Sequence, residues 1–74
     1  MREIELPSDV TGSVWKVLVS PGQTVDEDEV LVLIESMKME IPVLACESGI
    51  VKAILLKEGD PVAEGDTVAI LDVQ

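Results

Sequence analysis

Apolar residues occur in short runs that are rich in Val, Ile and Leu and are separated by polar turn sequences. Branched side chains of this kind favour strands over helices. The pattern predicts strands over residues 2–6, 13–19, 30–35, 39–46, 50–56 and 67–72. Turns are expected at Pro21-Gly22, Gly59-Asp60-Pro61 and Glu64-Gly65-Asp66, because Pro fixes φ and Gly permits a positive φ. Short strands punctuated this regularly predict an all-β fold, a sandwich or flattened β-barrel.

The same pattern occurs twice along the chain. Residues 12–35 and residues 49–72 align at a constant offset of 37 positions without a gap. Two copies of one unit in so short a chain predict one domain, residues 1–74, with internal pseudo-twofold symmetry. Neither copy alone could bury both faces of its strands, so we expect the copies to interleave. The matching positions are Gly12 and Gly49, Val14 and Val51, Leu18 and Leu55, Gly22 and Gly59, Val25 and Val62, and Glu27 and Glu64.

The repeat also predicts the environment of single residues. Val25 and Val62 are isolated apolar residues at equivalent positions in polar loops, so each is expected to close one end of the core. Trp15 aligns with Lys52, which indicates that its position tolerates a charge and that Trp15 is partly exposed. The spacing of apolar residues changes parity within both copies, which predicts β-bulges near residues 15–16 and 52–53.

The net charge of −10 restricts the kinds of partner that the chain can bind. It argues against nucleic acid, which binds proteins through Lys and Arg, and against anionic membranes. The longest uncharged apolar run, residues 30–34, is too short to span a bilayer. Two interpretations of the acidity stay open: it keeps the domain soluble, or it steers the domain toward basic clefts on partner proteins. The acidic run at residues 26–29 is expected to be a solvated loop.

Cysteine usage and the start of the chain predict a cytoplasmic location. The single Cys46 cannot form an internal disulfide, which is compatible with a reducing compartment. The sequence shows no basic and apolar leader, so nothing in it suggests secretion. Cys46 falls on the strand face opposite Val43 and Ala45, so we expect a partly exposed thiol without a chemical role.

The connection between residues 35 and 41 is where the sequence departs from local preference. The simplest connection is a two-residue hairpin with Met37 and Lys38 at its corners, yet such turns normally use Asn or Gly because they need a positive φ. Strain on the order of 1 kcal/mol is expected there, and such departures mark functional sites. Lys38 directly follows copy one, whereas the chain stops after copy two, so Lys38 should lie opposite the termini. A plain surface turn or an uninterrupted strand remains the alternative.

The residues around this turn suit a modification site better than a catalytic one. An exposed lysine amine is a nucleophile only when deprotonated, and Glu35 and Glu40 favour its charged form, so an outside enzyme would supply the base. Met37 and Met39 are flexible and polarizable, which suits docking against other proteins. The chain has no His, its one Cys cannot build a thiolate metal cluster, and no glycine spacing matches a phosphate-binding loop. We therefore expect a non-catalytic protein without a metal.

The run Glu35-Ser36-Met37-Lys38-Met39 resembles the Glu-Ala-Met-Lys-Met signature of biotinyl domains, the carriers of biotin-dependent carboxylases. Residues 12–14, 21–25 and 59–66 match the pattern of this family too, so the resemblance covers nearly the whole chain. Ser36 stands where Ala is commoner in the family. A serine at this position is seen in compact biotin/lipoyl attachment proteins. The resemblance implies two four-stranded antiparallel sheets, with Lys38 on the exposed hairpin and the termini opposite.

By resemblance, a biotin-protein ligase attaches biotin to Lys38, and the domain carries a carboxyl group from a biotin carboxylase to a carboxyltransferase. Met37 and Met39 would guide recognition by the ligase, with Glu35, Ser36 and Glu40 as further contacts. The chain lacks the long insertion of some bacterial acetyl-CoA carboxylase carriers. It is closer to the compact type found in acyl-CoA, pyruvate and urea carboxylases and in small attachment proteins.

Two other functions remain open from the sequence. A lipoyl carrier would have the same fold and the same lysine, although lipoyl domains usually show Asp-Lys-Ala at the tip. A small acidic interaction module would instead use Met37 and Met39 as an adhesive patch without a prosthetic group.

Overall fold

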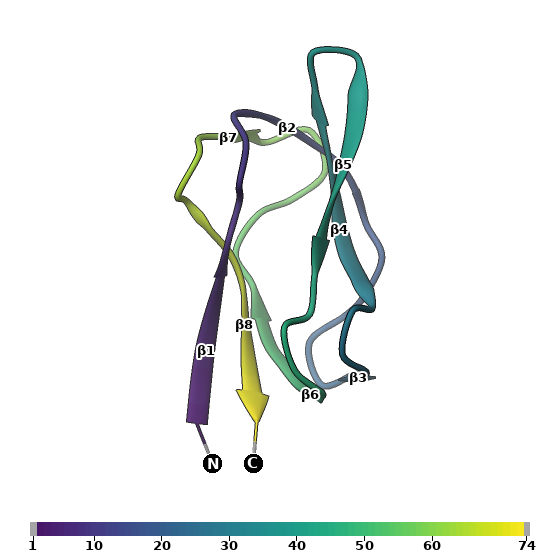
Figure 1. Cartoon of the computed structure of the whole chain (residues 1–74), viewed down its shortest axis with the longest axis vertical. Helices are drawn as coiled ribbons and strands as arrows, with labels where there is room; N and C mark the ends of the chain where they lie inside the picture. The colour runs from purple at the N-terminus through teal and green to yellow at the C-terminus, as the bar shows by residue number, and fades with distance from the viewer. Residues whose placement is uncertain (1, 74) are drawn as a thin grey trace.

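Eight β-strands make up the fold in a computed structural model that describes residues 2–73 (Figure 1). Residues 2–73 form no helix, and Met1 and Gln74 lie outside the described residues. The strands form two four-stranded antiparallel sheets, which confirms the predicted fold: the first sheet has the order β1-β8-β6-β3 and the second the order β5-β4-β2-β7. The strands are β1 (Arg2–Pro7), β2 (Gly12–Val17), β3 (Thr24–Val25), β4 (Val30–Ser36), β5 (Met39–Leu44), β6 (Gly49–Ile54), β7 (Pro61–Val62) and β8 (Thr67–Val73).

The two copies interleave, as the sequence predicts. Strand β3 belongs to the first copy but pairs with β6 of the second, whereas β7 belongs to the second copy and pairs with β2 of the first. The backbone bonds at these crossings are equivalent. The Gly22 amide donates to the Val51 carbonyl at 2.7 Å, and the Gly59 amide donates to the Val14 carbonyl at 2.7 Å. Each sheet is therefore completed by a short strand from the other copy.

The symmetry reaches further than the sequence alignment indicates. The Asp28 amide donates to the Ala45 carbonyl at 2.8 Å, and at the same offset the Gly65 amide donates to the Ser8 carbonyl at 2.8 Å. Ser8 and Ala45 are both buried. The strands that precede them, β1 and β5, are therefore equivalent as well, and both are edge strands.

The core lies between the two sheets and is built almost entirely from aliphatic side chains. Val25 and Val62 are 1% and 3% exposed, which confirms that these lone apolar residues close the ends of the core. No polar side-chain atom buried within residues 2–73 lacks a hydrogen-bond partner. The buried apolar residues are Leu6, Val14, Val19, Val25, Leu31, Val32, Ile34, Val43, Ala45, Val51, Val62, Val68, Ala69, Leu71 and Val73.

Both predicted bulges are present. The register of β2 against β4 shifts between Val14 and Lys16, and that of β6 against β8 shifts between Val51 and Ala53. The extra residue in β2 is Trp15, which is 41% exposed, in agreement with its alignment to a lysine. The bulges turn Val14 and Val51 toward the core despite the change of parity.

The strand ends differ from the prediction in a few places. The strands predicted to reach residues 19, 46 and 56 end at Val17, Leu44 and Ile54, because the chain leaves the sheet there. Val19 is buried although it lies outside the sheet, which explains the apolar residue at this position. Strand β1 continues through Pro7, which an edge strand tolerates because one side of it has no neighbouring strand.

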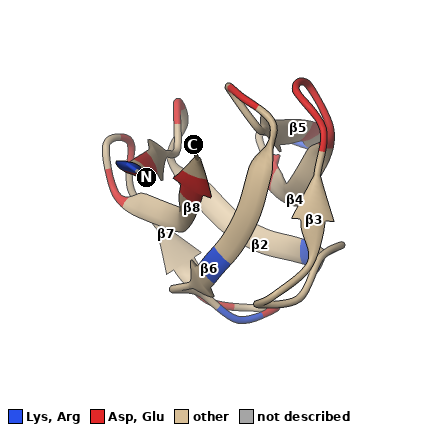
Figure 2. Cartoon of the chain, turned by 90° about the horizontal axis from the view of Figure 1, so that it is seen from below, with Lys and Arg blue, Asp and Glu red and all other residues tan. Residues whose placement is uncertain are grey.

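The β4–β5 hairpin lies at one end of the long axis, and the paired strands β1 and β8 end at the other, with Arg2 opposite Val73 (Figure 1). The molecule measures 35 × 19 × 18 Å along its principal axes. Seen from the end that holds Arg2 and Val73, the two sheets enclose the core, and many acidic residues lie on the loops around it (Figure 2). The predicted separation between the hairpin and the chain ends is confirmed for the described residues.

Candidate functional site

The hairpin between β4 and β5 has a two-residue loop, as predicted. Ser36 pairs with Met39, which leaves Met37 and Lys38 as the two corner residues. Their φ angles are 51° and 65°, so both occupy the left-handed region that Gly or Asn normally fills in such turns. The unfavourable backbone conformation expected from the sequence is present at both corner residues. It allows the chain to reverse direction in a loop of two residues.

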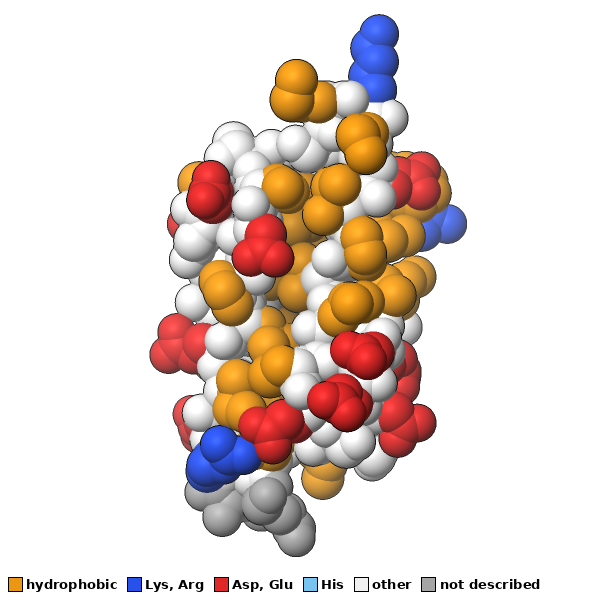
Figure 3. All heavy atoms as spheres, viewed as in Figure 1, with side chains coloured by type: hydrophobic (Ala, Val, Ile, Leu, Met, Phe, Trp, Pro, Cys, Tyr) orange, Lys and Arg blue, Asp and Glu red, His pale blue; other side chains and the backbone are white. Residues whose placement is uncertain are grey.

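The tip of the hairpin extends into solvent. Met37 is 93% exposed and Met39 is 62% exposed, and Lys38 is exposed as well. A basic side chain projects from the top of the molecule in Figure 3, with hydrophobic side chains below it. The ion pairs among residues 2–73 join Arg2 to Glu47 and Lys52 to Glu3, and neither involves Lys38. The amine of Lys38 is therefore exposed and has no ion-pair partner among residues 2–73.

The base of the hairpin is fixed to the connection between β1 and β2. The Ser36 hydroxyl donates to the Thr11 carbonyl at 2.8 Å. Next to it, a Cβ added to Gly12 would lie 2.1 Å from the Glu35 carbonyl oxygen, so only glycine fits there. From the sequence, Ser36 was expected only to contribute to recognition, and its bond to Thr11 was not predicted. The only hint in the sequence was that glycine occurs at both equivalent positions, Gly12 and Gly49. Both lie close to a backbone carbonyl, since a Cβ on Gly49 would lie 2.4 Å from the Asp72 carbonyl oxygen.

Two carboxylates flank the base of the hairpin. Glu35 and Glu40 are directly opposite each other across β4 and β5, and both are exposed. Like charges at such a position are unfavourable for the sheet. No ion pair within residues 2–73 involves either of them. Their negative charge therefore stands uncompensated on the outer face of the second sheet, close to the tip.

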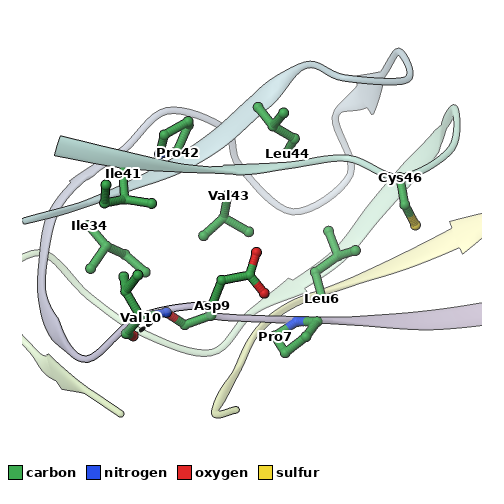
Figure 4. Close-up of a pocket in the computed structure, with 11 residues that line it drawn as sticks. Leu6, Pro7, Asp9, Val10, Ile34, Ile41, Pro42, Val43, Leu44 and Cys46 are labelled. Carbon is green, nitrogen blue, oxygen red and sulfur yellow. Dashed lines mark hydrogen bonds between the residues drawn. The ribbon is translucent and has the colours of Figure 1, made fainter. Parts of the chain in front are cut away.

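A hollow of about 270 Å³ lies between the edge strands β1 and β5, below the hairpin. Its walls are mostly apolar, and hydrophobic side chains follow it down the face seen in Figure 3. The Asp9 carboxylate points into it, and Cys46 lies at one end (Figure 4). The hydroxyl of Ser8, which also lies in the wall of the hollow, donates a hydrogen bond to the Val10 carbonyl and accepts one from the Val10 amide. No nucleophile and base meet there.

The remaining chemistry-bearing residues do not form a site. Cys46 is an exposed free thiol, as expected. Within residues 2–73, no group of three or more His, Cys, Asp or Glu side chains could hold a metal ion. No part of the same range forms a helix long and apolar enough to cross a bilayer. What the arrangement offers is a primary amine, held in water at the end of a short rigid hairpin.

Comparison with known proteins agrees with this geometry. Residues 3–71 match the family model described as biotin-requiring enzyme. The chain belongs to the biotin/lipoyl attachment domain family. Over 67 residues this attachment domain is 43% identical to the biotinylated protein TB7.3 homolog of Mycobacterium leprae, which covers 90% of the chain and 94% of that protein. It is 48% identical over 59 residues to the biotin/lipoyl attachment protein of Bacillus subtilis, covering 80% of the chain and 81% of that protein.

Among solved structures, the attachment domain is similar to part of the urea carboxylase of Kluyveromyces lactis. The TM-score is 0.92 at 39% sequence identity, and the similarity covers 97% of this chain and 6% of that one. The domain thus corresponds to one small part of a large carboxylase, and to nearly the whole of the two short relatives.

Proposed function

We propose that residues 1–74 act as a biotin carboxyl carrier domain in which the amine of Lys38 carries biotin through an amide bond. The observation that carries this proposal is the two-residue hairpin that presents Lys38, with both corner residues at positive φ. A turn that keeps an unfavourable conformation, although Asn or Gly would fit it better, indicates that the side chains themselves are needed.

The environment of Lys38 fits amide formation better than that of the other lysines. The Glu3 carboxylate accepts a hydrogen bond from Lys52 and raises the pKa of Lys52 above its usual value. The Lys16 amine lies 5.1 Å from the centre of the Trp15 ring. Lys57 lies outside the strands, in the connection between β6 and β7. Lys38 alone stands at the tip of a β-hairpin, between two exposed methionines.

In this function the chain carries a group and catalyses nothing. When attached, biotin supplies a ureido nitrogen that takes up and releases a carboxyl group. Lys38 provides a tether with a reach of about 15 Å for stem and arm together, estimated from ordinary bond lengths. Such a tether keeps the carried group at an effective concentration in the mM range near a docked enzyme. The β4–β5 hairpin holds the tether clear of the rest of the domain.

The partners in this proposal are a biotin-protein ligase, a biotin carboxylase and a carboxyltransferase, and the location is cytoplasmic. The ligase forms the bond between the Lys38 amine and the biotin carboxyl group, and must remove the proton of the amine. Met37 and Met39 are the side chains that it would contact, because they are the most exposed apolar residues beside Lys38. The similarity to urea carboxylase supports the two other partners.

Lipoate on the same lysine is the second candidate. The chain is 48% identical to a protein named for both biotin and lipoyl attachment, and the hairpin geometry serves either group. We favour biotin because Met37 and Met39 flank Lys38 in place of the Asp and Ala that lipoyl domains usually show.

The test is a reconstituted reaction with the full chain, ATP, and either a biotin-protein ligase with biotin or a lipoate ligase with lipoate. Intact mass would report the adduct. We expect one biotin per chain, a slower or absent reaction with lipoate, and no adduct on Lys38→Arg. Lys57→Arg is the matched control and should accept biotin at the wild-type rate.

Faster modification by lipoate than by biotin would show that lipoate is the group carried by Lys38. An unmodified wild-type chain under both conditions would refute the carrier function and favour the acidic interaction module.

A further inference from the structure

The outer faces of the two sheets differ, although their strands are equivalent. On the second sheet, Leu33 of β4 pairs with Pro42 of β5 and with Lys16 of β2, and Val30 pairs with Leu44. Val14 and Ile34, the neighbours of Trp15 and Leu33 along their strands, are buried, so the paired set faces outward. We call the following residues the apolar face: Trp15, Leu18, Val30, Leu33, Pro42 and Leu44. All six are exposed or half-buried.

At three of the six equivalent positions the first sheet is apolar too, because Leu55, Ile70 and Pro7 match Leu18, Leu33 and Leu44. At the other three positions it carries Lys52 in place of Trp15, Glu5 in place of Pro42 and Thr67 in place of Val30. These residues bond with their neighbours: the Thr67 hydroxyl donates to Glu5 at 3.1 Å, and Lys52 pairs with Glu3. The outer face of the first sheet thus has polar or charged residues at three positions where the second sheet has Trp15, Val30 and Pro42. The fold itself does not require apolar residues at those three positions.

The charges at both ends of the apolar face are negative, and Lys16 is a basic side chain on the face itself, with its amine 5.1 Å from the centre of the Trp15 ring. Glu35 and Glu40 border the face toward the hairpin tip without an ion pair among residues 2–73. The acidic run at residues 26–29 borders it at the other end, where the amide of Asp28 and the carbonyl of Glu29 bond to Ala45, directly after Leu44. A second copy of this chain, with the same net charge of −10, would be repelled. The complementary partner has an apolar patch bordered by Lys and Arg.

From these observations we infer that the apolar face is the docking surface for the enzyme that carboxylates the carried biotin, an inference that rests on the proposed function. That enzyme binds ATP and bicarbonate, both anions, so we expect Lys and Arg at its active site, where their charge complements the acidic borders of the apolar face. Strand β4 runs from the apolar face directly to the hairpin with Lys38. An enzyme seated on this face therefore lies on the same side as the tether.

The test exchanges residues between the faces of the full biotinylated chain. Trp15→Lys with Pro42→Glu gives the second sheet the residues that the first sheet carries at the equivalent positions, and it keeps the net charge. Because the fold accepts Lys52 and Glu5 there, the variant should fold. The matched control, Ile50→Lys with Pro7→Glu, places the same two charges on exposed apolar positions of the first sheet. Intact mass establishes that each variant carries biotin before the assay.

The assay uses the purified biotin carboxylase of the same organism and follows ADP release that depends on the biotinylated chain. We expect Trp15→Lys/Pro42→Glu to lower kcat/KM by about tenfold or more, mainly through KM, as for loss of a buried aromatic anchor at an interface. The first-sheet control should stay within about twofold of wild type. The wild-type KM should rise with ionic strength, because the surrounding charges are screened.

Free biotin as substrate needs no docking, and its turnover establishes that the enzyme is active. Equal kinetics for the two double variants, at full biotin loading, would overturn the docking surface and leave the carrier function intact. A loaded wild-type chain that supports no ADP release, while free biotin does, would refute the carrier function itself.

Discussion

Met37 and Lys38 hold a backbone conformation that their side chains disfavour, with φ of 51° and 65°. Asp28 is the third such residue within the described range 2–73, with φ of 69°, and its equivalent in the other copy is Gly65 with φ of 92°. Because Gly65 occupies the equivalent position, the fold should accept glycine at residue 28 as well. At the hairpin tip the strain is retained with Met and Lys, and we attribute this to the role of the two side chains.

Relief of that strain should stabilise the protein and abolish its function. Met37→Asn with Lys38→Gly gives the sequence that two-residue hairpins prefer, so the free energy of unfolding should rise by about 1 kcal/mol. Urea denaturation measures the change, and biotin attachment should be lost. Asp28→Gly is the control: it relieves the same kind of strain far from Lys38, and attachment should continue. A tip variant less stable than wild type would show that the turn is not strained.

The hairpin acts as an element because its base is fixed. Gly12 touches the Glu35 carbonyl, and Ser36 bonds to Thr11, so β4 cannot shift against the connection between β1 and β2. These two contacts hold the tip upright above the sheet. The residues of the site could be named from the sequence, but the contacts that hold the site could not, because Thr11 and Ser36 are distant along the chain.

A methyl group at Gly12 should disturb the hairpin specifically. Gly12→Ala would press a Cβ against the Glu35 carbonyl oxygen, and Gly49→Ala would press one against the Asp72 carbonyl oxygen at the equivalent place. Each should cost about 1–3 kcal/mol of stability, the usual range for overpacking. Only Gly12→Ala should also slow biotin attachment at a temperature where both variants are folded. Equal attachment rates for the two would show that the tip does not depend on this contact.

The bond from Ser36 should contribute less. Ser36→Ala removes one partly exposed hydrogen bond, so the free energy of unfolding should fall by about 0.5–1.5 kcal/mol in urea denaturation. Attachment should persist, because Ala is the commoner residue at this place in the family signature. Loss of attachment with unchanged stability would instead make Ser36 a recognition residue.

At the scale of the whole molecule, β3 and β7 cross between the copies and join both sheets to one core. Val25→Ala and Val62→Ala should therefore destabilise by similar amounts, about 2 kcal/mol each for a buried aliphatic truncation. Both should unfold in a single transition when fluorescence of Trp15 and circular dichroism are compared. Separate transitions for the two probes would show that the copies fold independently.

The repeat explains how much of this molecule the sequence could predict. It predicted the burial of Val25 and Val62, both bulges and the isolation of Lys38, because side chains at equivalent positions obey the same constraints. It did not predict that β1 and β5 are equivalent, since their likeness lies in backbone bonds and edge position. The apolar face was not predicted either, because it depends on the pairing of β4 with β5, whose register shifts between Val30 and Val32.

Peptide mass spectrometry of the chain isolated from its own cells would identify the modified lysine directly. We predict biotin in amide linkage on Lys38, with Lys16, Lys52 and Lys57 unmodified. An unmodified Lys38, or biotin on one of the other three lysines, would contradict this prediction.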